Sequence, residues 1–438
     1  MRNPNDLSAF WLPFTPNRAF KAEPRMLARA EGMYFYDESG RALLDACAGL
    51  WCVNAGHGRK PIAEAIARAA QELDFAPTFQ FAHPTAFSLA QRIAAMAPDG
   101  MDHVFFVNSG SEACDTALKI ARAYFQKVGQ GGRFRLIGRE KGYHGTTFAG
   151  ISVGGLANNR KPYGPLLPGT DDHLPLPYDA TMRFTRREPQ GGADYADALD
   201  SVVALHGAET IAAVIVEPFA GSAGVYAPPK DYLKRLRAIC DRYGILLIFD
   251  EVITGFGRLG HAFAAERYGV TPDIITFAKG VSNGAVPMGG AIVSNRVHDA
   301  FMTGPGHQIE LFHGHTYSAH PLACAAALAT LDIYRDEGLF ERAAKLEPVL
   351  EDAVHALKDA PFVRDIRNVG LAAGIELEPD AAAPGRRGLD AIRFAFADEN
   401  LVIRVGGDTI ALSPPLIATE DEIGRMVDGV RRVLQRLS

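Results

Sequence analysis

The sequence lacks a basic run, a long apolar run and a leader pattern. Its 438 residues include 45 Lys and Arg against 51 Asp and Glu, a net charge of −6 with both signs interspersed. Without a basic stretch that could follow a phosphate backbone, no nucleic acid is expected as a partner. No stretch reaches the roughly 20 apolar residues that span a bilayer, and residues 1–20 show no signal-peptide pattern. We therefore expect a cytoplasmic protein that does not bind membranes.

Patterns typical of disulfide frameworks and metal centres are also missing. The cysteines are odd in number, scattered and never spaced as C-x-x-C, which indicates reduced thiols; they are Cys47, Cys52, Cys114, Cys240 and Cys324. His313, His315 and His320 are close in sequence, but no acidic or cysteine ligand accompanies them at a recognisable spacing. No metal site is predicted.

The hydrophobic content of 47% and the length are enough for a large core and for two domains. In the middle of the chain, short apolar runs without polar alternation are separated by helical patterns. Such runs are typical of buried strands in a mostly parallel sheet with covering helices, an α/β fold. The predicted strands are 104–107, 211–216, 245–249 and 274–278.

Near residue 325 the pattern becomes helical, and a strand-like segment then opens a C-terminal unit. We expect the strand-like residues 33–49 to pack with this unit, because chain termini often lie close together. The predicted division is an N-terminal segment, a large α/β domain and a smaller α+β domain, at residues 1–65, 66–325 and 326–438.

Each predicted strand ends in polar or small residues. These ends are Asn108 to Ser111, Glu217, Asp250 with Glu251, and Lys279. In open α/β sheets the ligand site lies outside the carboxyl ends of the strands, so these groups are expected to meet in one cleft.

Lys279 stands alone between an apolar strand and a glycine-rich loop. Burial disfavours an ammonium group and lowers its pKa, which would leave a free amine for a Schiff base. The alternative is an ordinary surface lysine in a loop. Asp250 ends a neighbouring strand and could hold a protonated pyridinium nitrogen; its alternatives are a helix cap or an ion pair with Arg258.

Two more features fit a cofactor with a phosphate and an aromatic ring. Ser109, Gly110 and Ser111 precede a predicted helix, and the N–H groups at a helix N-terminus bind anions, although a single N-cap serine is the simpler explanation. Tyr143, followed by His144, could stack on a ring, or it could be ordinary packing.

A dinucleotide fingerprint is present but incomplete. Residues 255–260 fit G-x-G-x-x-G, yet Lys279 lies where the acidic ribose ligand should be. A nicotinamide oxidoreductase is therefore disfavoured.

Five segments together carry a resemblance to a known family. They are N-S-G-S-E-A, G-Y-H-G-T-T, L-L-I-F-D-E-V-I-T-G-F-G-R, F-A-K-G-V-S-N-G and H-T-Y-S-A-H-P. In order and spacing over nearly the whole chain, they resemble the class III (ω-)aminotransferases of fold type I. The resemblance implies a pyridoxal-5′-phosphate enzyme with Lys279 as the Schiff-base lysine and proton shuttle. It implies that Asp250 is the pyridinium partner, that Tyr143 and Val252 pack on opposite ring faces, and that Glu217 lies near the floor of the site. The remaining implied cofactor ligands are Ser109, Gly110, Ser111, His144 and, from a neighbouring subunit, Thr316.

The segment A-G-L-W-C-V-N-A-G-H-G-R is most similar to the ω-amino acid:pyruvate (β-alanine:pyruvate) branch. That resemblance places Trp51, Phe79 and Tyr143 in the substrate pocket and makes Arg404 the arginine that binds a substrate carboxylate. A surface ion pair is the alternative for Arg404. The implied assembly is a homodimer or homotetramer with its active site at the subunit interface, acting on amine and keto-acid substrates.

One departure bears on the acceptor. Branches that use 2-oxoglutarate usually read E-P-x-Q-G-E, whereas residues 217–222 read E-P-F-A-G-S. The second glutamate, which pairs with the family's arginine, is missing, and this favours pyruvate. The alternatives left open are a 4-aminobutyrate or diamine aminotransferase using 2-oxoglutarate, and an aminomutase or decarboxylase of the same fold.

Overall fold

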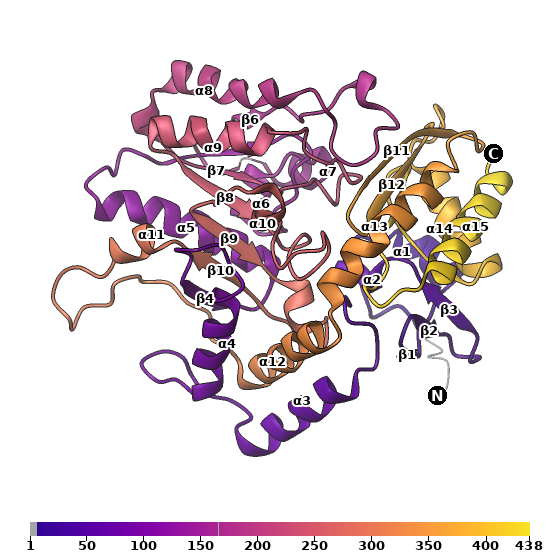
Figure 1. Ribbon diagram of the computed structural model, residues 1–438, viewed down its shortest axis with the longest axis horizontal. Coiled ribbons are helices and arrows are strands. Elements are labelled where there is room, and N and C mark those ends of the chain that lie inside the picture. Colours follow the sequence, from indigo (N-terminus) through magenta and orange to yellow (C-terminus); the bar gives the residue numbers. More distant parts are fainter. Residues whose placement is uncertain (1–6, 165) are drawn as a thin grey trace.

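A seven-stranded sheet forms the centre of the larger part of the protein (Figure 1), in a computed structural model that describes residues 7–164 and 166–438. The strand order is β4-β10-β9-β8-β7-β5-β6; β10 pairs antiparallel with both β4 and β9, and the other pairs are parallel. The strands are β4 (His103–Val107), β5 (Arg135–Arg139), β6 (His173–Leu174), β7 (Ile211–Val216), β8 (Leu246–Asp250), β9 (Ile274–Phe277) and β10 (Gly289–Val293). The predicted mostly parallel sheet and its four predicted strands are confirmed.

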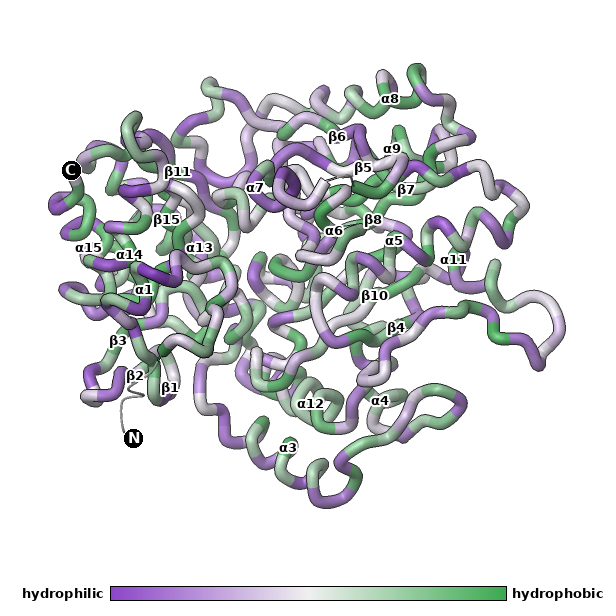
Figure 2. The backbone as a smooth tube through the Cα atoms, turned by 180° about the vertical axis from the view of Figure 1, so that it is seen from behind, coloured by the Kyte–Doolittle hydropathy of each residue, from purple (hydrophilic) through white to green (hydrophobic). Residues whose placement is uncertain are grey.

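The central strands are apolar on both faces because helices cover both. In β7, Val214 and Val216 belong to one core cluster while Ala213 and Ile215 belong to another. Strands without polar alternation are expected where both faces are buried, and Figure 2 shows β7 and β8 as hydrophobic segments. One face is covered by α5 (Gly110–Lys127), α6 (Phe148–Val153) and α11 (Asn295–Asp299), the other by α4 (Pro84–Ala94), α8 (Ala198–His206), α9 (Tyr232–Tyr243) and α12 (Pro321–Asp336).

Two smaller sheets are built from the N-terminal and C-terminal segments. The first has the order β1-β2-β3-β13, and its β3 pairs in parallel with β13, so that Leu44 lies opposite Leu401. The predicted association of residues 33–49 with the C-terminal unit is thus confirmed. Its strands are β1 (Arg29–Glu31), β2 (Tyr34–Tyr36), β3 (Ala42–Asp45) and β13 (Leu401–Val402).

The second small sheet is antiparallel, with the order β11-β12-β15-β14. Its strands are β11 (Val363–Val369), β12 (Ala372–Leu377), β14 (Arg404–Gly406) and β15 (Thr409–Leu412). Helices α13 (Leu339–His355) and α14 (Arg386–Asp398) pack on these strands, and α15 (Glu420–Arg436) packs on the two helices. Thr419 and Glu422 form a reciprocal capping box that begins α15.

The remaining helices are short, apart from α3 (Lys60–Glu72), which packs on α12. They are α1 (Asn17–Ala22), α2 (Ala48–Trp51), α7 (Ala157–Arg160), α10 (Ala264–Tyr268) and the 3-10 turns η1 (Lys161–Tyr163), η2 (Ala180–Met182), η3 (Ala193–Asp197), η4 (Ala208–Thr210) and η5 (Lys279–Ser282). Among the described residues, no helix has the length and apolar character needed to cross a membrane.

The division at residues 65 and 325 stays a prediction. Helix α12 runs without interruption across position 325, and residues 1–6 of the predicted N-terminal segment lie outside the described residues.

Candidate active site

A cavity opens at the carboxyl ends of β7, β8 and β9, where the sequence predicts a cleft. Its walls come from the beginning of α5, the loop after β5 and the residues that follow these three strands. They are Gly110, Ser111, Cys114, Tyr143, His144, Gly145, Glu217, Phe219, Asp250, Val252, Ile253, Thr254 and Lys279. The predicted meeting of Glu217, Asp250 and Lys279 with the start of α5 is confirmed.

The first turn of α5 presents backbone rather than side chains to Val252. Ser109 is the N-cap and accepts a hydrogen bond from the backbone N–H of Glu112 at 3.2 Å. A Cβ atom at Gly110 would lie 2.9 Å from Cγ1 of Val252, so this close approach requires glycine. Ser111 Oγ accepts from the backbone N–H of Thr146 at 3.1 Å. Gly110 and Ser111 line the cavity, whereas Ser109 lies outside its lining.

Asp250 is buried and its carboxylate is held by several donors. Nδ1 of His144 lies 2.8 Å from Oδ2, and Sγ of Cys114 lies 3.2 Å from the same oxygen. Oδ1 accepts from the backbone N–H of Val252 at 3.1 Å and from the Thr276 hydroxyl at 3.3 Å. Burial opposes the charged form, but the hydrogen bonds, led by that of His144, hold the pKa of Asp250 below its usual value.

The alternative of an ion pair between Asp250 and Arg258 is wrong. The Arg258 guanidinium donates to the carbonyl oxygens of Leu371 and Pro414 and to the side chain of Asn54, and so joins the segment after β8 to residues near both ends of the chain. The partner of Asp250 is instead His144, which comes from a loop more than 100 residues earlier in the chain.

Lys279 follows β9 and opens a short 3-10 turn with a φ of 49°. Non-glycine residues rarely adopt this left-handed conformation, and active sites are among the places where such residues cluster. Burial lowers the pKa of Lys279, and the positive charge of Arg404 acts in the same direction. The free amine is therefore more available than that of an exposed lysine.

Glu217 connects the loop of Tyr143 to the strand β7. Its Oε1 accepts from the backbone N–H of Tyr143 at 2.9 Å, and Oε2 accepts from that of Gly221 at 3.0 Å. Burial raises the pKa of Glu217 above its usual value. The carboxyl group thus holds two loops together at the wall of the cavity.

The four other predicted site residues lie outside the lining of the cavity. Trp51 is buried against Phe219, with ring centroids 6.4 Å apart. Arg404 is close enough for its charge to act on Lys279 and Tyr143, and its guanidinium makes no ion pair or hydrogen bond with any described residue. Phe79 and Thr316 are exposed on the surface of this chain.

The family follows from a comparison with known proteins. The family model described as aminotransferase class III matches residues 17–434. The chain belongs to this family. An ω-aminotransferase of Caulobacter vibrioides is 59% identical to this aminotransferase over 98% of each chain. A β-alanine–pyruvate aminotransferase of Pseudomonas aeruginosa is 48% identical over 99% of this chain and 97% of its own.

A solved structure is also similar to the whole aminotransferase. It is a PLP-bound amine transaminase from an uncultivated Pseudomonas species, 39% identical, covering 99% of this chain and 100% of its own with a TM-score of 0.90. The predicted family and fold are thereby confirmed.

The sequence interpretation missed several wall residues of the aminotransferase's cavity, among them Cys114, Phe219, Ile253 and Thr254. Helix spacing could have identified Cys114, because it lies four residues after Gly110 on α5 and residues four apart lie on the same face of a helix. No sequence signal separates Phe219 and Ile253 from ordinary core residues.

Two rejected sequence patterns have structural roles in the aminotransferase. Residues 255–260 form turns between β8 and α10 rather than opening a helix. His313 lies 2.8 Å from the Thr116 hydroxyl and 2.9 Å from the Lys119 amine. Burial lowers the pKa of His313 to about 4.

Proposed function

We propose that this aminotransferase moves the amino group of an ω-amino acid such as β-alanine to pyruvate, with pyridoxal 5′-phosphate as cofactor. The observation that carries the proposal is that Lys279, with its lowered pKa, and Asp250, held ionised, line the same cavity. The cofactor's carbonyl needs a neutral amine, and its ring nitrogen needs a carboxylate. The donor set of the cavity fits the cofactor.

The remaining walls suit the phosphate and the ring. The start of α5 offers backbone N–H groups for an anion, and Ser109, Gly110 and Ser111 would hold the phosphate there. The ring of Tyr143 and the side chain of Val252 would pack on the two faces of the cofactor.

Each chain residue then has a task in both half-reactions. When bound, pyridoxal phosphate accepts the donor's amino group, withdraws electrons from the substrate carbon and delivers the amino group to the acceptor. Nζ of Lys279 would hold the cofactor and carry the proton at the substrate carbon. Asp250, supported by His144, would keep the ring nitrogen protonated. One product must leave before the second substrate binds, so the kinetics are ping-pong.

The lack of an ion-pair partner for Arg404 among the described residues favours substrates with a single carboxylate. Its guanidinium is unpaired among residues 7–164 and 166–438, and position 222 carries serine where 2-oxoglutarate-using branches have glutamate. A planar guanidinium binds a carboxylate through two parallel hydrogen bonds. β-Alanine and pyruvate each offer one carboxylate, while 2-oxoglutarate carries a second that needs another cation. Trp51, Phe79 and Tyr143 would complete an aromatic pocket for a short chain.

Acceptor preference tests this assignment. The holoenzyme is incubated with β-alanine and either pyruvate or 2-oxoglutarate, and alanine and glutamate are quantified. Alanine is expected in equal amount to the β-alanine consumed, and glutamate formation is expected to be slower by about tenfold or more, the effect of one unsatisfied charged group. Faster glutamate formation would favour the 2-oxoglutarate branch. Alanine formed without consumption of pyruvate would point to an aminomutase, and loss of β-alanine with release of carbon dioxide would point to a decarboxylase.

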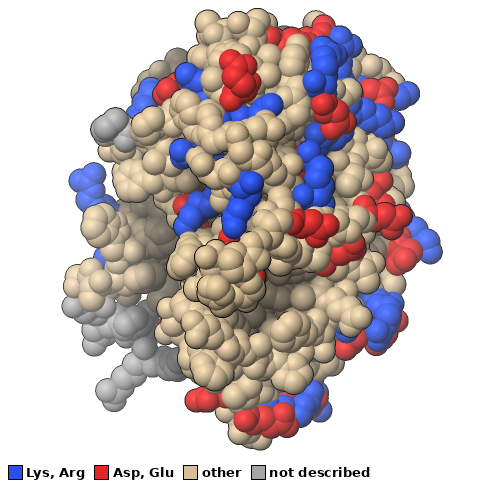
Figure 3. Space-filling model, turned by 90° about the vertical axis from the view of Figure 1, so that its left-hand side faces the viewer, with Lys and Arg blue, Asp and Glu red and all other residues tan. Residues whose placement is uncertain are grey.

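We also propose a homodimer, or a pair of such dimers, with the active site at the subunit interface. Figure 3 shows a face of the molecule with broad uncharged areas and a hollow among them. A hollow of about 740 Å³ has Phe79, Phe81 and Phe87 in its walls, and these side chains are 56%, 71% and 68% exposed. Exposed apolar patches mark interaction surfaces. Thr316 would reach the phosphate of the partner's site. A cytoplasmic location stays a prediction.

A further inference from the structure

One row of paired residues crosses the four-stranded sheet of the C-terminal unit. Arg367 on β11 lies opposite Gly374 on β12, and Gly374 lies opposite Ala411 on β15. Ala411 in turn lies opposite Arg404 on β14. Directly opposed residues of antiparallel strands point to the same face of the sheet. Arg367 and Arg404 therefore project from the same face, at the two edges, with only small residues between them.

This face lies against the loop that leaves the active site after Glu217. Nε of Arg367 donates to the carbonyl oxygen of Gly224 at 2.9 Å. A Cβ atom at Gly374 would lie 2.3 Å from the same oxygen, so glycine is required for this approach. A Cβ atom at Gly406, two residues after Arg404, would lie 3.4 Å from the carbonyl oxygen of Ser222. Residues 222–224 thus lie along the face, between Arg367 and β14.

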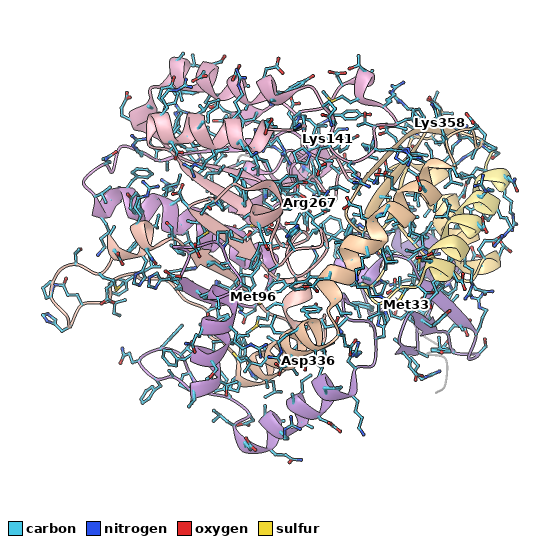
Figure 4. The ribbon with its side chains drawn as sticks, viewed as in Figure 1. Met33, Met96, Lys141, Arg267, Asp336 and Lys358 are labelled. Carbon is cyan, nitrogen blue, oxygen red and sulfur yellow. The ribbon has the colours of Figure 1, made fainter. Side chains whose placement is uncertain are left out.

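The same loop is attached to the cavity at both of its ends. At its start, Glu217 accepts from the backbone N–H groups of Gly221 and Tyr143. At its end, the hydroxyl of Tyr226 accepts from Nζ of Lys141 at 2.9 Å, two residues before Tyr143. Figure 4 shows Lys141 between the seven-stranded sheet and the C-terminal unit.

Arg367 is itself held rigidly. It is 4% exposed, and its Nη1 donates to Asp365 at 2.5 Å and to Glu376 at 2.6 Å. Its guanidinium carbon lies 4.0 Å from the ring centroid of Tyr226. A charge fixed in this way can act as an anchor, because its neighbours determine its rotamer.

We infer that Arg367 is a positioning residue for Arg404: it holds the loop after Glu217 against the sheet face that presents Arg404, and so sets the distance between that guanidinium and the cavity. This inference rests on the proposed function, in which Arg404 binds the carboxylate of the substrate. Loosening the anchor weakens binding of carboxylate-bearing donors and leaves amines without a carboxylate unaffected.

The test uses the first half-reaction, in which an amine donor bleaches the visible absorption of the holoenzyme without any acceptor. β-Alanine is compared with propylamine, in which a methyl group replaces the carboxylate. The variants are Arg367→Lys, which keeps the charge for Asp365 and Glu376 but removes the Nε donor, and Gly374→Ala, which pushes the loop away. Each is expected to raise the half-saturating concentration of β-alanine about tenfold or more, as for a lost charge-assisted contact. The values for propylamine and the maximal bleaching rates stay unchanged.

Two further variants serve as the positive and the negative control. Arg404→Met is expected to show the same selective loss. Arg187→Met removes an ion pair between a half-exposed guanidinium and the buried Glu351 of α13, outside the row, and is expected to change the half-saturating concentration of neither donor. The inference would be overturned if the row variants weakened the binding of both donors equally, or if they changed the binding of neither. It would also be overturned if Arg404→Met showed no selective loss of β-alanine binding. If β-alanine fails to bleach the wild-type enzyme while propylamine succeeds, the proposed function itself is wrong. Either of the two row variants alone suffices if the other does not fold.

Discussion

Two ionisable side chains of the cavity, Lys279 and Asp250, have opposite requirements that the fold meets in one place. An amine that attacks a carbonyl must lose its proton, and burial favours this loss because it lowers the pKa of the amine. A carboxylate that holds a pyridinium must stay charged, so it needs donors to offset burial. Asp250 has such donors in His144 and Val252. Lys279 has no hydrogen-bonding partner for its amine among the described residues.

The lowered pKa of Lys279 predicts how the apo chain takes up its cofactor at different pH values. The neutral amine is the reactive form, so the rate rises with pH and levels off at the pKa of Lys279. We expect this plateau at a lower pH than for the same reaction of Nα-acetyl-lysine. The measurement is the growth of visible absorbance after mixing with pyridoxal phosphate. A plateau at or above that of the free amine would show that burial does not activate Lys279.

At the scale of secondary-structure elements, the sequence predicted the central strands because both of their faces are apolar. It predicted the cavity residues at strand ends for a topological reason, since parallel strands end at the same edge. Strands β5 and β10 were not predicted: β5 begins and ends with arginine, and β10 begins with two glycines, which carry no strand signal. The pairing of His144 with Asp250 could not be predicted, because only the fold brings their loops together.

The start of α5 allows a prediction about close packing. A methyl group introduced by Gly110→Ala would press on Val252, whose backbone N–H supports Asp250. Overpacking of this kind costs about 1–3 kcal/mol, so we expect the dissociation constant of pyridoxal phosphate to rise roughly fivefold to a hundredfold.

Equilibrium titration of the apo chain measures this effect. The matched control is Gly424→Ala on α15, where a Cβ atom meets nothing within 4 Å and cofactor affinity is expected to stay unchanged. Unchanged affinity in Gly110→Ala would show that Val252 yields without disturbing the site.

At the scale of the whole molecule, the residues predicted to bind substrate or cofactor come from segments far apart in the sequence, and only the fold can bring them together. Trp51 comes from α2, Arg404 from the C-terminal sheet, and Thr316 from an exposed loop. Among them, Trp51 and Arg404 approach the cavity within one chain. Thr316 does not line the cavity of its own chain, and its role was predicted from the family resemblance alone.

A shared site predicts that two defective chains can restore one working site. Lys279→Ala removes the amine, and in the proposed dimer Thr316→Asp would place a negative charge near the phosphate of the partner's site. Each variant alone is expected to be inactive or nearly so. When the two are co-expressed, each mixed dimer has one site with both native residues, so activity is expected to recover to about a quarter of the wild-type value.

The control pairs Lys279→Ala with a chain that carries both substitutions, which leaves no intact lysine. No recovery in the first mixture, with mixed dimers verified by mass spectrometry, would contradict a site shared between subunits.

The most direct test of ω-amino acid transamination by this chain is the absorbance spectrum of the purified protein with pyridoxal phosphate, recorded before and after β-alanine and again after pyruvate. A visible band that β-alanine removes and pyruvate restores, and that is absent in Lys279→Ala, is the predicted result. A band that β-alanine leaves unchanged would contradict the proposed donor, and the absence of any visible band in the wild-type protein would contradict the role of Lys279.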